Sequence, residues 1–389
     1  MEHNEKIRGK KIALFAHVTE GTSGLDDELV LYLRKNGARE IVYVKFPFTF
    51  SSRPSVKVFR YIDGKECYSE SLIRFYKPEP LSYIKDFLYA IFYGIQYCRG
   101  VDLFIGMNNL LAFSGIVLKK LHLVKKVAYY MIDYTPIRYD NVILNNLYYR
   151  LDKLACYHSD IVLPLHEKLI EGRVNHGRIV RDRVRYVVTP FGNNSDMYAD
   201  EEYTRFDRKK IVYFGGVMKS KGAELFVPII QELIKRGNTD VVFECLGGGD
   251  TEYLRNQVKA NSLEKFFNIY GRIEDHQEVE KMLLGYGVAI APYYPEDENN
   301  FSYYTDPGKV KVYLGCGLPI VITDVPPIAQ NLAERGAGLI SRYDASDFAE
   351  KIMKILDPVR YNGYRGRAIV FGKEFSWKKI FSRVFNTVF

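Results

Sequence analysis

The 389-residue sequence lacks the marks of several protein classes. Its five cysteines are scattered, odd in number and never arranged as Cys-x-x-Cys, so we expect free thiols in a reducing compartment and no zinc site. No apolar run reaches the ~20 residues that a membrane span needs. The longest uncharged stretch, Leu103 to Leu118, is interrupted by Asn108 and Asn109. The chain begins with polar and partly acidic residues, which is not the pattern of a signal peptide.

Cofactor-binding motifs are missing as well. Neither Gly-x-Gly-x-x-Gly after the first strand nor a Walker A motif is present, which disfavours NAD-dependent and P-loop chemistry. His158, His166 and His276 lie far apart in the sequence, without the spacing of metal ligands. We therefore predict no metal site and no cofactor.

The net charge indicates the kind of partner, and the length indicates the number of domains. The chain holds 55 Lys and Arg against 47 Asp and Glu, a net charge of +8 with a pI near 8.9. This excess favours an anionic partner such as a nucleotide, a phospholipid surface or nucleic acid. No basic-aromatic readout motif supports nucleic acid, so we expect none. The length predicts two domains rather than one core.

The first half alternates β-rich runs with amphipathic helical stretches, which predicts a mostly parallel sheet covered on both faces. The stretch from Ser51 to Leu81 fits less well, and either an irregular insertion or a hairpin around Asp63 and Gly64 would explain it. Strands are expected at Lys11–Val18, Glu40–Phe46, Asp102–Met107, Val127–Ile132, Asp160–Leu165 and Tyr186–Val188. Helices are expected at Leu25–Lys35, Tyr83–Cys98, Leu110–Leu121 and Asn141–Tyr157.

The second half repeats the pattern, so the expected fold is α/β with two doubly wound, Rossmann-like domains that face a cleft and bind ligands at the carboxyl ends of their strands. We predict domains at 1–192 and 209–372, a polar linker at 193–208, and a terminal helix at 373–389 that crosses back to the first domain. Strands are expected at Lys210–Phe214, Asp240–Leu246, Phe267–Tyr270, Val288–Pro292, Pro319–Thr323 and Gly338–Arg342. Helices are expected at Ala223–Arg236, Thr251–Ala260, Gln277–Leu284, Gly308–Leu314, Ile328–Glu334 and Ser346–Leu356.

One helix start is typical of an anion site. Asp306 suits an N-cap and Pro307 the first helical position, because proline has no N–H to leave unpaired. The N–H groups near Gly308 and Lys309 would then offer a positive dipole end beside an ammonium. An ordinary capped helix is the alternative reading.

Four motifs together resemble the GT-B glycosyltransferases, most closely the family 4-like members. They are Phe214-Gly-Gly-Val-Met-Lys-Ser-Lys-Gly222, Leu246-Gly-Gly-Gly-Asp250, Tyr270-Gly-Arg272 with Ala289–Tyr293, and Thr305-Asp-Pro-Gly-Lys309 followed by Tyr313–Val321. The resemblance implies an acceptor-binding first domain and a nucleotide-sugar-binding second domain. It also implies metal-independent, hexosyl-type glycosyl transfer, in which basic groups and helix dipoles replace a metal.

The resemblance has gaps at the donor site. The family's E-x7-E glutamates are replaced by Tyr304 and Val312, and its phosphate-binding arginine by Gly216. Asp306, Lys309, Lys219 and Lys221 are the available substitutes, and a similar Asp-Pro-x-Lys variant belongs to bacterial exopolysaccharide enzymes. The implied donor-binding residues are Gly215, Gly216, Lys219, Lys221, Gly248, Arg272, Tyr304, Asp306, Lys309 and Tyr313. A solvated lysine pair and a plain tight turn at Gly247–Gly249 are the alternatives.

In the first domain, Asp133 follows a buried strand and would lie at its carboxyl end. It would be the general base for the acceptor hydroxyl in an inverting enzyme, or would orient the acceptor in a retaining one. An Asx-turn before Pro136 is the alternative. The resemblance also places an acceptor-contacting loop after the first strand, although capping or burial would explain its residues equally well. The acceptor or cleft residues are His17, near the end of that strand, and Glu20, Gly21 and Gly24 of the loop.

We therefore expect a glycosyltransferase that uses a UDP-sugar and a lipid-linked or polysaccharide-precursor acceptor. A nucleotide-sugar epimerase and a non-catalytic nucleotide-sugar binding protein are the alternatives. Aromatic residues along Tyr83–Arg99, together with basic clusters, would suit anionic lipid, or would be core aromatics and solvated charge. The expected location is cytoplasmic, and a peripheral position on the inner face of the cytoplasmic membrane stays open.

Overall fold

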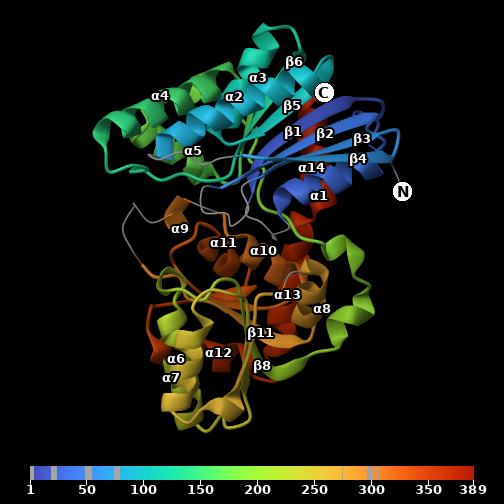
Figure 1. Ribbon diagram of the computed structural model, residues 1–389. Helices are drawn as coiled ribbons and strands as arrows, with labels where there is room; N and C mark the ends of the chain where they lie inside the picture. The colour runs from blue at the N-terminus through green and yellow to red at the C-terminus, as the bar shows by residue number, and fades with distance from the viewer. Residues whose placement is uncertain are drawn as a thin grey trace. The chain divides into compact units, whose positions relative to one another are not determined.

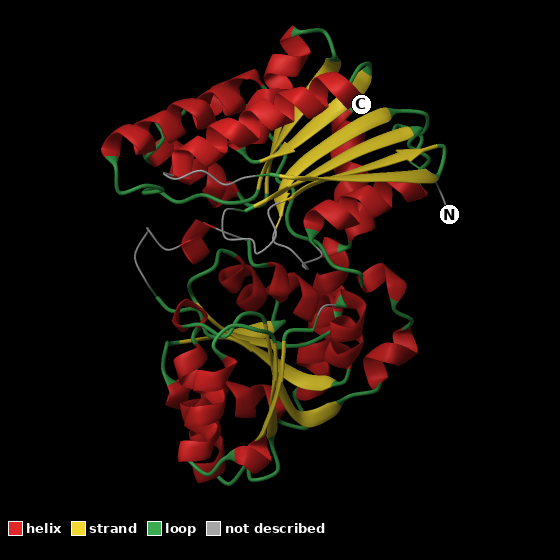
Figure 2. Ribbon diagram, viewed as in Figure 1, coloured by secondary structure: helices red, strands yellow, loops and turns green. Residues whose placement is uncertain are grey.

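The computed structural model describes the chain except residues 1–3, 19–23, 49–54, 74–78, 274, 296–300 and 305, together with the side chains of 79, 80, 301 and 302. The chain forms two compact units. The first comprises Met1–Pro190 with Ile380–Phe389, and the second comprises Phe191–Lys379. Each unit is a sheet with helices on both faces, which confirms the predicted α/β class (Figure 1, Figure 2).

The first unit holds a seven-stranded sheet of order β4-β3-β2-β1-β5-β6-β7. Its strands are β1 (Lys11–Val18), β2 (Glu40–Pro47), β3 (Ser55–Ile62), β4 (Lys65–Leu72), β5 (Val101–Met107), β6 (Val124–Met131) and β7 (Ile161–Pro164). Its helices are α1 (Leu25–Lys35), α2 (Glu79–Tyr97), α3 (Asn109–Lys120), α4 (Val142–His158) and α5 (Glu167–Asn175), and most of α14 (Trp377–Val388) joins them.

Two features of the first unit differ from a regular parallel sheet with the expected strands. β3 and β4 are antiparallel and form the hairpin that the sequence left open. Asp63 and Gly64 have φ values of 48° and 80°, which is the conformation that a two-residue hairpin turn requires. The predicted Tyr186–Val188 does not form a full strand: it makes an isolated parallel bridge between Tyr186 and Val162, and the Val187 N–H donates to the Val162 carbonyl of β7 at 3.0 Å.

The second unit holds a six-stranded, fully parallel sheet of order β10-β9-β8-β11-β12-β13. Its strands are β8 (Asp207–Phe214), β9 (Val242–Leu246), β10 (Phe267–Gly271), β11 (Tyr286–Ala291), β12 (Ile320–Thr323) and β13 (Gly338–Ser341). Its helices are α6 (Phe226–Lys235), α7 (Thr251–Ala260), α8 (His276–Leu284), α9 (Phe301–Tyr304), α10 (Gly308–Gly315), α11 (Ile328–Glu334), α12 (Ala345–Leu356) and α13 (Tyr361–Gly372).

Both faces of the central strands of this second sheet are buried, which explains why β11 and β12 are continuous apolar runs. Ile211 and Tyr213 of β8 belong to a core shared with α6, α7 and α12. Val212, between them, points to the other face and belongs to the core shared with α8, α10, α11 and α13. Alternation of side chains along each strand therefore supplies both cores.

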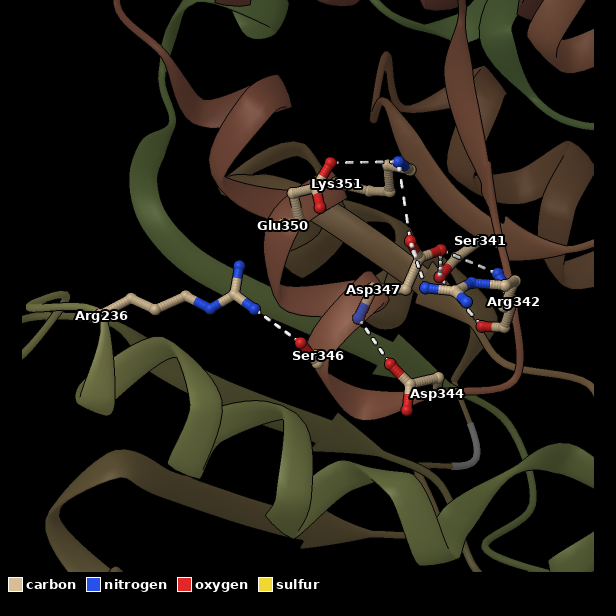
Figure 3. Close-up of polar contacts among 8 residues, drawn as sticks. All are labelled: Arg236, Ser341, Arg342, Asp344, Ser346, Asp347, Glu350 and Lys351. Carbon is tan, nitrogen blue, oxygen red and sulfur yellow. Dashed lines mark hydrogen bonds and ion pairs between the residues drawn. The ribbon is translucent and has the colours of Figure 1, made fainter.

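The helix starts are set by short polar contacts, as at the start of α12 (Figure 3). The Asp344 carboxylate accepts a hydrogen bond from the Asp347 N–H at 2.9 Å. Asp347 in turn accepts from the Ser341 hydroxyl and the Arg342 N–H, both at 2.9 Å. Burial raises the pKa of Asp347, but these hydrogen bonds outweigh it and the net pKa is lowered. The end of β13 is thereby tied to the helix that follows it.

The strand orders define a switch point in each sheet. β1 lies between β2 and β5, and β8 lies between β9 and β11, so successive connections leave these central strands in opposite directions. Crevices form at the carboxyl ends of strands at such points, and ligands of open α/β sheets bind there. In the first unit that edge carries His17 and Asn108, and in the second it carries Gly215 and Pro292.

The predicted linker, 193–208, is counted with the second unit. Asn193 is buried there, and its side-chain amide donates to the carbonyls of Lys311 (2.9 Å) and Gly372 (3.0 Å). At the other end of the chain, the terminal helix is divided, since Ile380–Phe389 is counted with the first unit. There Tyr32 packs against Phe381, with ring centroids 5.3 Å apart.

The first unit contains a fully buried ion pair whose loss should be costly. Arg173 Nε donates to Asp152 Oδ2 at 2.7 Å, and both side chains are almost completely buried. Arg173→Met would leave a buried carboxylate uncompensated and should lower the free energy of unfolding by about 3–5 kcal/mol. Urea unfolding followed by circular dichroism measures the change. Arg150→Met, at an exposed position of α4, is the control; equal stability of the two variants would contradict the prediction.

Candidate functional site

Two glycine turns meet at the switch point of the second unit. The Val217 N–H donates to the Gly248 carbonyl at 2.7 Å, and the Gly215 N–H donates to the Leu246 carbonyl at 2.9 Å. A Cβ on Gly247 would lie 2.1 Å from the Gly215 carbonyl oxygen. Gly247 is therefore required for packing between the turns, whereas Gly216 is exposed.

Lys309, in the first turn of α10, lies against the first of these turns. Its Nζ donates to the Tyr213 hydroxyl at 2.9 Å and stands 4.1 Å from the centre of that ring. A Cβ on Gly215 would be only 3.0 Å from the same Nζ. The Tyr213 hydroxyl also donates to the Gly216 carbonyl at 2.8 Å, so one phenol connects the lysine to the glycine turn.

A second lysine shares this environment. Nζ of Lys221 lies 5.0 Å from the centre of the Tyr293 ring, and Nζ of Lys309 lies 5.3 Å from the same ring. Burial lowers the pKa of Lys221. Burial, and then repulsion from Lys221, holds the pKa of Lys309 well below its usual range. Lys219, by contrast, is exposed and rests 5.4 Å over the Tyr294 ring.

The Lys309 ammonium donates to a neutral group, the Tyr213 hydroxyl. Over the ranges that the structure describes, no carboxylate forms an ion pair with Lys309. Desolvation makes an ammonium costly, and a nearby anion would offset that cost. The Lys221 and Lys309 pair, beside the exposed backbone of Gly216, is therefore suited to bind a polyanionic group.

Asp306 is not the N-cap of α10. The N-cap position of α10 is Pro307, which has no side-chain cap, so the prediction that Asp306 caps the helix is wrong. The Asp306 carboxylate instead accepts from Lys311 Nζ at 2.7 Å and from the Phe191 N–H at 2.9 Å. Both side chains of the pair are buried, and a buried ammonium needs its counter-ion more than a helix start needs a cap.

The other predicted donor residues are placed in different surroundings. The Tyr313 hydroxyl accepts from the Phe214 N–H at 2.5 Å and donates to the Phe214 carbonyl at 3.3 Å, so it holds the end of β8 from inside the core. Tyr304 is buried at the end of α9. Arg272 is exposed after β10, and Gly248 faces it, since a Cβ on Gly248 would lie 3.3 Å from Arg272 Cβ.

The first unit has a pocket of about 300 Å³ at the carboxyl ends of β1, β5 and β6. Its polar lining includes Asp133, Arg138, His17 and Asn108. Most of the remaining lining is apolar or aromatic, and much of it comes from three helices. Those apolar residues include Ile84 and Phe87 of α2, Leu110 and Phe113 of α3, and Leu144, Leu147 and Leu151 of α4.

Asp133 is held from two sides. Its Oδ2 lies 3.3 Å from Arg138 Nη1, and its backbone carbonyl accepts from Arg173 Nη2 at 3.0 Å. Burial opposes the charge of Arg138, but Asp133 and nearby tyrosines outweigh it and raise the pKa of that guanidinium. About a third of the Asp133 side chain remains exposed, so the carboxylate is accessible from the pocket.

His17 is fixed in one tautomer. The Asn108 side-chain oxygen accepts from the Leu111 N–H at 2.9 Å, so the amide nitrogen points at His17 Nδ1, 2.7 Å away. Nδ1 must then accept, and Nε2–H donates to Asp86 Oδ2 at 3.2 Å. With both nitrogens engaged, His17 shapes the pocket rather than serving as its base.

The predicted acceptor loop is only partly visible. Glu20 and Gly21 lie outside the described residues, and Gly24 occupies the N-cap position of α1. Asn108, Arg138 and Asp86 were not predicted as site residues. The first could have been found, because it directly follows strand β5, but the other two come from a loop and a helix with no local signal.

Comparisons with known proteins identify this architecture. Residues 208–358 match the family of glycosyl transferases, group 1. Sucrose-phosphate synthase from Thermosynechococcus elongatus is 15% identical, over 97% of this chain and 98% of that one, with a TM-score of 0.67. WaaG, a glycosyltransferase involved in lipopolysaccharide biosynthesis, is 11% identical over 97% and 99%, with a TM-score of 0.66. The chain has the GT-B fold.

A third GT-B structure shows the ligands of one such protein. HepE of Anabaena, in complex with UDP and glucose, is 12% identical over 97% of this chain and 99% of that one, with a TM-score of 0.65. The resemblance to GT-B glycosyltransferases is thus confirmed. No curated protein sequence matches the chain significantly.

None of the described helices is both long and apolar enough to cross a bilayer. In the same part of the chain, no three His, Cys, Asp or Glu side chains gather closely enough to hold a metal ion.

The lysine pair leads to a binding prediction. Lys309→Met removes a buried ammonium, so UDP should bind about 10- to 100-fold more weakly. Lys219→Met removes an exposed ammonium and should bind UDP within about threefold of the wild type, because exposed charges contribute little. Isothermal titration calorimetry measures both. Equal losses in the two variants would refute the assignment of Lys309.

The lowered pKa of Lys309 leads to a pH prediction. A bound diphosphate favours the ammonium and raises that pKa, so between the free and bound pKa values binding takes up a proton. Affinity should therefore fall as pH rises through the lowered pKa of the free site. Calorimetry in buffers of different ionisation enthalpy measures the uptake. Lys309→Met should abolish most of it, and an unchanged uptake would contradict the prediction.

Proposed function

We propose that the chain transfers a sugar from a nucleotide-diphosphate donor, with UDP favoured, to a hydroxyl acceptor. The observation that carries this proposal is the Lys221 and Lys309 pair, which lies inside the segment matched by the glycosyl transferase family. The structure of HepE with UDP and glucose supports the choice of UDP. Transfer of a hexosyl group without a metal is part of the same proposal.

The donor chemistry needs a cationic site for the leaving group. When the bond between the sugar and the diphosphate breaks, negative charge builds on the leaving nucleotide. Preorganised ammonium groups in a partly desolvated site offset that charge strongly, because little solvent has to reorganise. Lys309, held by Tyr213, and Lys221 would supply this effect.

The acceptor chemistry is assigned to the pocket of the first unit. Asp133 would accept the proton of the attacking hydroxyl in an inverting reaction, or orient the hydroxyl in a retaining one. Arg138 and Arg173 hold this carboxylate and its backbone in place. The acceptor is proposed to be a lipid-linked or polysaccharide-precursor glycan used by a bacterium, for example in exopolysaccharide synthesis. Peripheral contact with anionic membrane is supported by the net charge of +8.

A thermal-shift panel of UDP-, GDP-, ADP- and TDP-sugars tests the donor assignment. A ligand at ~100 times its dissociation constant stabilises the folded protein by ~2.7 kcal/mol, which such an assay detects. UDP-sugars should give the largest shift, and free UDP should appear quickly only when acceptor is present. Conversion of the donor alone would indicate an epimerase, and binding without turnover a binding protein.

Asp133→Asn tests the acceptor assignment. The amide cannot take a proton, so the rate of transfer should fall by about 10²- to 10⁴-fold if the carboxylate is the base. UDP affinity should be unchanged, because Asp133 belongs to the first unit. Asp140→Asn, at an exposed position of the same loop, is the control. Full activity of a folded Asp133→Asn enzyme would refute the role.

A further inference from the structure

Helix α2 presents an apolar face to solvent. Between Leu81 and Tyr97, six side chains are exposed, and five of them are large and apolar. These five are Leu81, Ile84, Leu88, Phe92 and Ile95, with exposed fractions between 45% and 61%. The charged residues of the same stretch, Lys85 and Asp86, are buried and paired at 3.0 Å. This is the reverse of an ordinary surface helix, whose polar side faces water.

The apolar face continues into the pocket of the first unit. Ile84 of α2 is 57% exposed and Leu147 of α4 is 61% exposed, and both also line the pocket. α3 contacts both α2 and α4 and lies between them, and its Leu110 and Phe113 line the pocket (Figure 1). The pocket and the α2 face are therefore one continuous apolar surface.

The pocket lining also includes polar groups. Asp133 and Arg138, 3.3 Å apart, line the same pocket as these apolar side chains, together with Asn108. A protein partner would match the exposed helix face, but it would not need an accessible carboxylate in the pocket. An occupant with a hydrocarbon chain and a hydroxyl-bearing head matches both parts.

On the described parts of α2 and α4, no exposed acidic side chain opposes an anionic head group. The acids of α2 and α4, apart from Glu79, are Asp86 and Asp152, and both are buried in ion pairs. Arg150 on α4 is exposed. An acceptor that carries phosphate between chain and sugar would meet no exposed carboxylate along these two described faces.

We propose that the pocket between α2 and α4 binds the hydrocarbon chain of an amphiphilic acceptor and thereby brings its head-group hydroxyl to Asp133. The assignment rests on the proposed function and adds the acceptor class: a sugar joined to an apolar chain, not a free soluble sugar. Burial of apolar surface supplies the affinity, and the polar groups of the pocket set the orientation of the head group.

The probe is a series of alkyl β-glucosides from hexyl to dodecyl, used below their micelle-forming concentrations, with binding measured by calorimetry. Affinity should rise by about two- to fourfold for each added methylene until the chain fills the pocket. Leu110→Trp, which fills the pocket, and Leu147→Asp, which places a charge on its rim, should each weaken dodecyl glucoside binding at least tenfold. Leu72→Asp, at an exposed apolar position of β4, should bind like the wild type.

Each outcome decides the inference. Equal affinity for short and long chains, or wild-type binding by both pocket variants, would overturn it. UDP binding is measured on the same samples. If the wild type binds UDP normally but binds no alkyl glucoside, only this inference is refuted. If the wild-type protein does not bind UDP, the proposed function is refuted. A third outcome is that the wild type dimerises, Leu147→Asp abolishes the dimer, and no glucoside binds. That result would assign the surface to a second copy of the chain and would overturn the inference as well.

Discussion

The Tyr213 phenol is the contact on which the donor site depends. It accepts from the Lys309 ammonium and donates to the Gly216 carbonyl, so a single hydroxyl connects strand β8, helix α10 and the first glycine turn. A phenol can satisfy the ammonium without neutralising it. A carboxylate at that place would satisfy the same donor but cancel its charge, and the site would lose its attraction for a diphosphate.

The first unit also holds its functional group from behind, but there the partner is a counter-ion. Asp133 carries its carboxylate at the edge of an apolar pocket, where Arg138 is 3.3 Å away and Arg173 secures the backbone. Arg173 itself is buried and satisfied by Asp152, so its position cannot adjust to the occupant. Rigid supports of this kind allow a reactive group to act without reorganisation cost. In both units, a polar contact behind the site keeps the functional side chain in place.

Many of the strands and helices, and part of the candidate site, could be predicted from the sequence. Strands such as Ile320–Thr323 are buried on both faces and are therefore apolar throughout, and the Asp63-Gly64 pair fits a hairpin turn. Lys309 could be associated with an anion site because glycine turns and a helix start accompany it in sequence.

The site contacts that the sequence did not predict have one physical cause. Asp306 followed by Pro307 is a local signal for a cap, but the buried Lys311 claims the carboxylate. Asp86 and Arg138 lie far from each other in sequence and reach the same pocket region only in the folded chain, so no spacing rule connects them. Local patterns predict elements well, whereas partners of buried charges depend on the whole fold.

The division of the chain between the units affects the order in which they can be completed during synthesis. The second unit is one continuous segment, Phe191–Lys379. The first unit includes Ile380–Phe389, so Tyr32 can pack against Phe381 and Phe385 only after the whole second unit has been synthesised. Domains generally form from the N-terminus as the chain emerges. Here the first unit is completed only after the second unit has been made, and a chain that has not reached Ile380 lacks the apolar cover of α1 even when all strands of the first unit are present.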